Sequence, residues 1–155
     1  MSIFLTLLML HLIGLVLMAG TTLINFINYQ TFWKLFDYQK EQATGVLATT
    51  ARLPRLIGIG AGLLVSTGIG MIALTDGVLA QQLWFRIKFV FVLLLIANNV
   101  FNGRKLEVKL RALISGNAPN LAAQTLNLQD RLRTYYLLQL GIFVIIIFLS
   151  AYKFN

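Results

Sequence analysis

Four long apolar stretches constrain this chain more than any other feature of its sequence. They are residues 3–29, 56–75, 83–103 and 134–152. The third includes Arg86 and Lys88, whereas the other three contain no Asp, Glu, Lys or Arg. A helix needs about 20 mostly apolar residues to cross the roughly 30 Å of hydrocarbon in a bilayer. We therefore predict an all-α fold, an integral membrane four-helix bundle that forms a single transmembrane domain over residues 1–155.

The composition excludes several classes of protein. Hydrophobic residues make up 58% of the 155 residues and charged residues 12%, which is too apolar for a water-soluble domain of this size. A soluble single-domain enzyme is therefore ruled out. The chain has no cysteine, which excludes a disulfide scaffold, a thiolate zinc site, an iron–sulfur cluster and a cysteine nucleophile. Any redox chemistry must come from other side chains or from a bound cofactor.

The basic residues indicate how the chain is oriented. Ten of the thirteen Lys and Arg residues lie in two connections, residues 30–55 and 103–133, whereas residues 75–82 carry only Asp76. Cytoplasmic loops are enriched in Lys and Arg. We therefore expect both basic connections in the cytoplasm and both termini outside, in a bacterial inner membrane. The net charge of +8 is then explained by topology, and nucleic acid is not an expected partner.

Both basic connections are expected to be partly helical. Apolar residues recur at helical spacing over residues 32–36 and 106–114, so the first and third helices should continue beyond the membrane. Residues 115–119 predict a turn, and residues 121–128 predict a short amphipathic helix before the fourth span. Pro54 suits the first turn of the second helix. The first stretch has no preceding Lys or Arg and no A-x-A-like site, so we expect it to remain as a helix.

Small residues follow the second helix at four-residue steps. They are Gly58, Gly62, Ser66 and Gly70. Such a stripe lets a neighbouring helix backbone approach closely. Two interpretations stay open, tight packing between helices and a flat ligand that lies against the stripe.

Polar residues inside the spans are few. Asn25, Asn98, Asn99 and Gln139 should form one layer near the cytoplasmic boundary. Hydrogen bonds between helices explain this layer, and contact with a quinone or a polar headgroup is the alternative. No Asp or Glu lies within any span. A carboxylate proton relay and an ion-coupled transporter are therefore disfavoured.

His11 and Lys88 should meet at one depth. Counted from the outer ends of their helices, His11 lies ~12 Å deep and Lys88 ~8 Å deep. A neutral imidazole is a common ligand of haem iron. A lysine whose side chain is desolvated can lose its proton and bind a metal. Lys88 or Arg86 could instead neutralise a porphyrin propionate. The structural alternatives are Lys88 and Arg86 at the lipid headgroups and His11 in a hydrogen bond between helices.

Three segments resemble a known superfamily. They are His11-Leu-Ile-Gly-Leu-Val-Leu-Met-Ala-Gly20, the pattern Arg55-Leu-Ile…Ser66-Thr-Gly68, and Trp84-Phe-Arg-Ile-Lys88. Over roughly residues 8–105 the chain resembles the small multi-span superfamily that contains HemJ-type protoporphyrinogen oxidases and CopD-type copper-resistance proteins. The resemblance implies haem b as cofactor, with roles for His11 and Lys88 in its binding, and protoporphyrinogen IX oxidation as activity.

Together these features predict a membrane protein that binds haem or a porphyrin. His11 is the expected iron ligand, Lys88 a second ligand or counter-charge, and Arg86 a propionate partner; no catalytic residue is assigned. The expected partners are membrane lipids and a porphyrin or quinone substrate, and a second copy of the chain is left open. The alternative is a non-catalytic membrane subunit or a lipid- or partner-binding bundle, in which His11 is only a packing residue.

Overall fold

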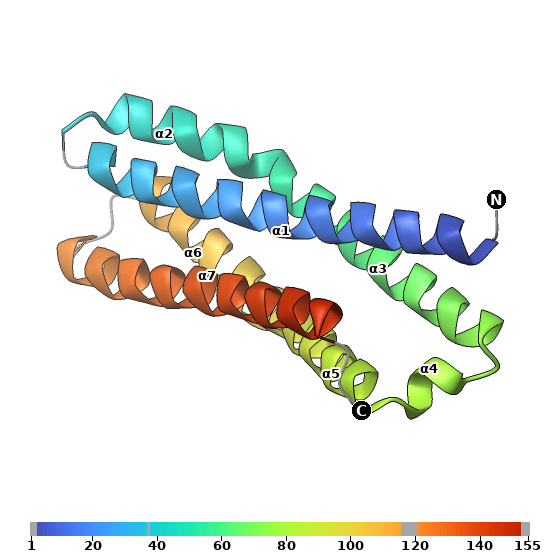
Figure 1. Ribbon diagram of the computed structural model, residues 1–155. Coiled ribbons are helices and arrows are strands. Elements are labelled where there is room, and N and C mark those ends of the chain that lie inside the picture. The colour runs from blue at the N-terminus through green and yellow to red at the C-terminus, as the bar shows by residue number, and fades with distance from the viewer. Residues whose placement is uncertain (1–2, 37, 116–120, 153–155) are drawn as a thin grey trace.

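The computed structural model describes residues 3–36, 38–115 and 121–152, and almost all of them are helical. The described part contains no strand, which agrees with the predicted all-α class. Four helical runs are long and apolar enough to cross a membrane: Ile3–Phe36, Lys40–Leu74, Leu83–Ala112 and Thr125–Ala151. Both chain ends and helix α4 lie at one end of the molecule, and helices α2 and α6 lie at the other (Figure 1). We call these the terminal end and the basic end.

Helix α1, Ile3–Phe36, is one unbroken helix of 34 residues. At 1.5 Å per residue it is ~51 Å long, so it extends well beyond a 30 Å hydrocarbon core, as the apolar spacing of residues 32–36 predicts. The chain returns through α2, Lys40–Thr49, and a short 3₁₀ turn, Thr50–Arg52. Helix α3, Leu53–Leu74, then begins with Pro54 in its first turn, where its missing N–H costs no hydrogen bond.

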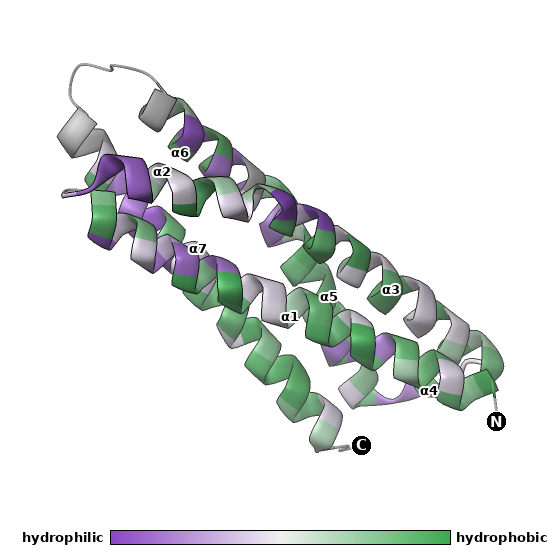
Figure 2. Ribbon diagram, turned by 90° about the horizontal axis from the view of Figure 1, so that it is seen from above, coloured by the Kyte–Doolittle hydropathy of each residue, from purple (hydrophilic) through white to green (hydrophobic). Residues whose placement is uncertain are grey.

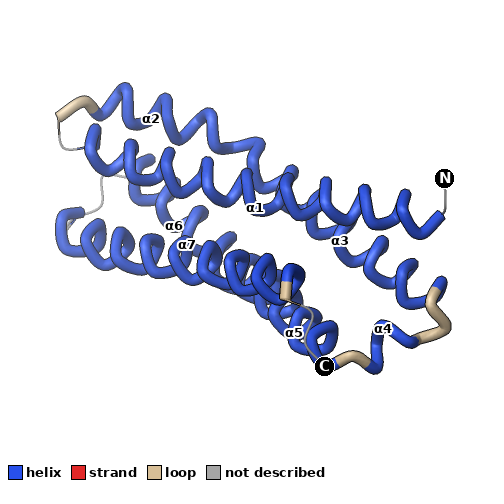
Figure 3. Tube along the Cα trace, viewed as in Figure 1, coloured by secondary structure: helices blue, strands red, loops and turns tan. Residues whose placement is uncertain are grey.

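A tight turn after α3 sends the chain into the third long helix. Asp76 and Gly77 both have positive φ, 47° and 80°, and the left-handed Gly77 precedes the four-residue helix α4, Val78–Gln81. Glycine adopts this conformation without the steric cost that a Cβ imposes. Helix α5, Leu83–Asn98, follows directly. The described loops are short and lie at the two ends of the molecule (Figure 3).

The third helix changes its winding before it leaves the bundle. After α5, residues Asn99–Gly103 form a π-helical turn, and α6, Arg104–Ser115, continues from it. Helix α6 agrees with the helix expected after the third span. The expected turn at 115–119 falls almost entirely on residues 116–120, which lie outside the described residues.

Helix α7, Leu121–Ala151, corrects one prediction. A separate short helix at residues 121–128 is wrong, because the same helix runs without a break from Leu121 through the fourth apolar stretch. No proline or glycine lies between residues 121 and 140, so nothing in that segment interrupts helical hydrogen bonding.

The long helices pack in pairs, α1 along α3 and α5 along α7, and α1 also contacts α7. Near the basic end the core is aromatic and includes Tyr29, Phe32 and Tyr136. A second cluster, which includes Met18, Leu64 and Phe143, lies along the middle of the helices. Apolar residues cover the outward surfaces of the helices as well (Figure 2). Apolar side chains on all sides are expected of helices that meet lipid rather than water.

Candidate functional site at the terminal half of the bundle

The close contact of α1 and α3 rests on a pair of glycines. A Cβ added at Gly60 would lie 2.9 Å from the Gly14 carbonyl oxygen and 3.0 Å from the Met18 nitrogen, and one added at Gly14 would lie 3.0 Å from the Gly60 oxygen. Real side chains do not approach so closely, so only glycine allows the two backbones to meet here. This close approach brings neighbouring polar side chains of α1 and α3 within hydrogen-bonding distance.

The predicted stripe of small residues is not the packing face. Added Cβ atoms at Gly58 and Gly62 would meet nothing within 4 Å, and Ser66 is exposed. The face of α3 that packs on α1 carries Gly60, Leu64 and Thr67 instead. Of the three stripe glycines, Gly70 alone has a close neighbour, the side chain of Leu7.

His11 is held by a threonine of α3. The His11 Nδ1 lies 2.9 Å from the Thr67 Oγ1, and Thr67, which is buried, donates its own hydroxyl proton to the Leu63 carbonyl. Because a hydroxyl has one proton to give, His11 must donate from Nδ1–H to Thr67. In the neutral imidazole, Nε2 is then the unprotonated nitrogen, which can bind a metal or accept a proton. Thr67 was not predicted as a site residue, although it lies within the quoted Ser66-Thr-Gly68 pattern.

Lys88 and His11 line one small cavity. Its other walls are apolar and come from α1, α3, α5 and α7, for example Met18, Leu64 and Phe143. Lys88 is half-buried and close enough to His11 for an electrostatic interaction. The structure therefore brings together the two residues that the sequence places at one depth. The centre of a water molecule can reach only about 10 Å³ of this cavity. The cavity therefore has room for a single water molecule.

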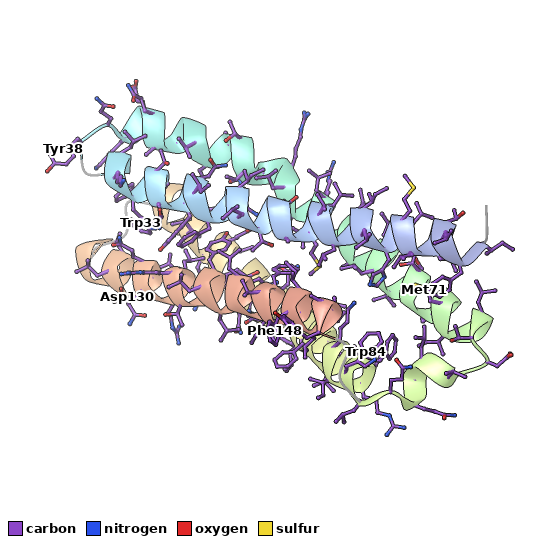
Figure 4. The ribbon with its side chains drawn as sticks, viewed as in Figure 1. Trp33, Tyr38, Met71, Trp84, Asp130 and Phe148 are labelled. Atoms are coloured by element: carbon purple, nitrogen blue, oxygen red, sulfur yellow. The ribbon has the colours of Figure 1, made fainter. Side chains whose placement is uncertain are left out.

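Arg86 is not part of this cavity. Its side chain is exposed, and its Nε donates a hydrogen bond of 2.8 Å to the Ala80 carbonyl oxygen in α4. The guanidinium is thus turned toward the connection between α3 and α5. Trp84, two residues earlier, is buried at the same end of the molecule, and Trp33 lies at the other end (Figure 4).

The predicted polar layer is largely formed, at the basic half of the bundle. Asn98 Nδ2 donates to Gln139 Oε1 over 2.9 Å, and the Tyr135 hydroxyl donates to Asn99 Oδ1 over 3.0 Å. These bonds join α5 and the π turn to α7. Asn25 of α1 is buried close by but makes no side-chain hydrogen bond to a residue that the structure describes.

No cluster of three or more His, Cys, Asp or Glu side chains that could hold a metal ion occurs among the described residues. Comparison with models of known protein families, with curated proteins and with solved structures finds no match for this chain.

Proposed function

We propose that this chain is a bacterial inner-membrane protein that binds haem b or a related porphyrin between α1, α3 and α5. Both termini are outside and both basic connections are in the cytoplasm. In this proposal the protein is an oxidoreductase of the protoporphyrinogen-oxidase type. One observation carries the proposal: His11 is fixed at Nδ1 by Thr67 and shares an apolar cavity with Lys88.

The donor chemistry of this cavity suits haem. A hydrogen bond to one ring nitrogen orients a metal-binding histidine and leaves the other nitrogen for the metal, which is the role we give Thr67. Lys88 would serve as second ligand or as counter-charge to a propionate. A bound haem supplies one-electron chemistry. The chain supplies the axial nitrogen, its orientation and an apolar wall that excludes water.

The space around His11 adds a condition to the proposal. The centre of a water molecule can reach only about 10 Å³ of this cavity, far less than the roughly 300–1,000 Å³ typical of small-molecule sites. A macrocycle therefore requires α5 to stand farther from the α1–α3 pair than it does here. Arg86 lies outside the cavity in this packing, so Lys88 is the better propionate partner.

The absorption spectrum of the purified protein tests the proposal. Protein from haem-competent cells should show a Soret band, and His11→Ala should reduce bound haem at least about tenfold, as expected when a metal ligand is lost. Leu12→Ala, at the adjacent lipid-facing position, is the matched control and should keep the band. Lys88→Met should move the band if Lys88 ligates the iron and only weaken haem binding if it is a counter-charge.

The second candidate is a non-catalytic membrane subunit or a lipid- or partner-binding bundle. The same bond between His11 and Thr67 favours it, because this bond ties α1 to α3 without any cofactor. Colourless wild-type protein with a folded His11→Ala variant would support this candidate and refute haem binding.

A further inference from the structure

A second pair of cavities lies toward the basic end, away from His11. The smaller cavity lies between α1, α2, α6 and α7, and the centre of a water molecule can reach about 30 Å³ of it. The larger cavity lies between α1, α3, α5, α6 and α7, and the centre of a water molecule can reach about 110 Å³ of it. This volume of about 110 Å³ is below the roughly 300–1,000 Å³ of a typical small-molecule site, so the cavity admits only a compact part of a ligand.

Three polar residues line both cavities: Asn25 from α1, Glu107 from α6 and Tyr136 from α7. Asn25 is 3% exposed and Tyr136 is 6% exposed. None of the three side chains makes a hydrogen bond to another side chain or backbone group that the structure describes. Buried polar groups are nearly always hydrogen-bonded. Asn25 and Tyr136 are buried, Glu107 is half-buried, and all three line one shared space, which indicates a site for a polar ligand.

The rest of the larger cavity is apolar. Its walls include Met18, Ile57 and Ala61 on one side and Ile96 and Val100 on the other. The ligand should therefore have an apolar body and a compact polar head. A phosphate headgroup does not suit the larger cavity, because the charged residue in its lining is Glu107 and like charges repel.

We propose that Asn25, Glu107 and Tyr136 bind the ring of a membrane quinone. The Tyr136 hydroxyl and the Asn25 amide N–H are donors for a quinone carbonyl oxygen. The Glu107 carboxylate and the Asn25 amide oxygen are acceptors for a quinol hydroxyl. The three residues thus match both forms of the ligand. This inference concerns binding alone and is independent of haem at His11.

The glycine pattern of α3 supplies a sharp test. Gly58 lines the larger cavity, and a Cβ there meets nothing within 4 Å. Gly58→Leu should therefore fill the cavity without forcing a backbone apart. Gly62, one turn along, also has open space around it but does not line this cavity. Gly62→Leu is the matched control.

Binding can be measured by quenching of tryptophan fluorescence. The chain has two tryptophans, and Trp33 packs against Tyr29, a residue that lines the smaller cavity. In the full chain with Trp84→Phe, decylubiquinone should quench Trp33 saturably. Gly58→Leu should abolish this quenching, Tyr136→Phe should weaken binding about five- to tenfold, as for one lost hydrogen bond, and Gly62→Leu should stay within about twofold.

Two results would overturn the proposal. One is that decylubiquinone quenches Trp33 without saturation, or to the same extent in Gly58→Leu and Gly62→Leu. The other is full competition by decylbenzene, which has an apolar ring and tail but no carbonyl. His11→Ala should leave quinone binding intact, so loss of haem and loss of quinone binding are separate outcomes.

Discussion

At the scale of single residues, Gly103 has the least room for a side chain among the described glycines. A Cβ there would lie 2.5 Å from the Tyr135 hydroxyl oxygen and 2.9 Å from Asn99 Oδ1. Gly103→Ala should therefore break the bond between Tyr135 and Asn99 and lower the free energy of unfolding by about 1–3 kcal/mol, as overpacking does. Thermal unfolding in detergent checks this. Gly20→Ala, where nothing lies within 4 Å, is the control, and equal effects would contradict the prediction.

Glu107, which lies in α6 beyond the apolar stretch of residues 83–103, should make stability depend on pH. Burial raises the pKa of its carboxyl above the ordinary value of 4.5, and the positive charge of Arg111 opposes this. The folded protein then holds the proton more tightly than the unfolded chain. This stabilising contribution is complete below the unfolded pKa and is lost as pH rises through the folded pKa.

We therefore expect the unfolding temperature of the wild type to fall more steeply than that of Glu107→Gln from pH 4.5 toward neutral pH. Thermal unfolding in detergent at several pH values measures this. The exposed Glu41 of α2 offers the control, since Glu41→Gln should keep the wild-type slope. Parallel curves for all three proteins would show that Glu107 ionisation does not affect folding.

At the scale of elements, the contact between α1 and α3 depends on Gly60. Gly60→Ala places a methyl group 2.9 Å from the Gly14 carbonyl, so the helices must separate, which should cost about 1–3 kcal/mol of unfolding free energy. Gly58→Ala and Gly62→Ala, in open space, should change it by less than about 1 kcal/mol. Thermal unfolding in detergent compares the three. A similar loss in all of them would restore the predicted stripe as the packing face.

At the scale of the whole molecule, the membrane orientation can be tested directly. The chain has no cysteine, so a single introduced thiol reports on its own position. Gln81→Cys lies in α4, just before the third long helix, and Lys109→Cys lies near the other end of that helix; both sites are exposed. An impermeant maleimide should label Cys at 81 in intact spheroplasts and Cys at 109 only after lysis. The reverse pattern would invert the topology, and labelling of both from outside would refute the span.

The sequence predicts the helices better than their contacts. Pro54 at the start of α3 and the continuation of α1 beyond residue 29 follow from local patterns, and both are seen. The partner of His11 could not be predicted, because α1 is apolar on all sides and its periodicity does not reveal a buried face. The stripe through Gly58 and Gly62 is wrong as a packing face for the same reason, because Gly60 makes the contact instead. A difference of two positions turns a helix by more than half a turn.

Local composition alone determined that this chain is helical and that four of its helices are long and apolar enough for a bilayer. Hydrophobicity and backbone hydrogen bonding act segment by segment, so they can be read without knowing what lies beside each segment. Only the tertiary structure decided that His11 bonds to Thr67 and lines one cavity with Lys88. It also decided that Asn25, Glu107 and Tyr136 line the same two cavities. Those contacts depend on how each helix is rotated about its own axis, and steric fit between helices sets that rotation.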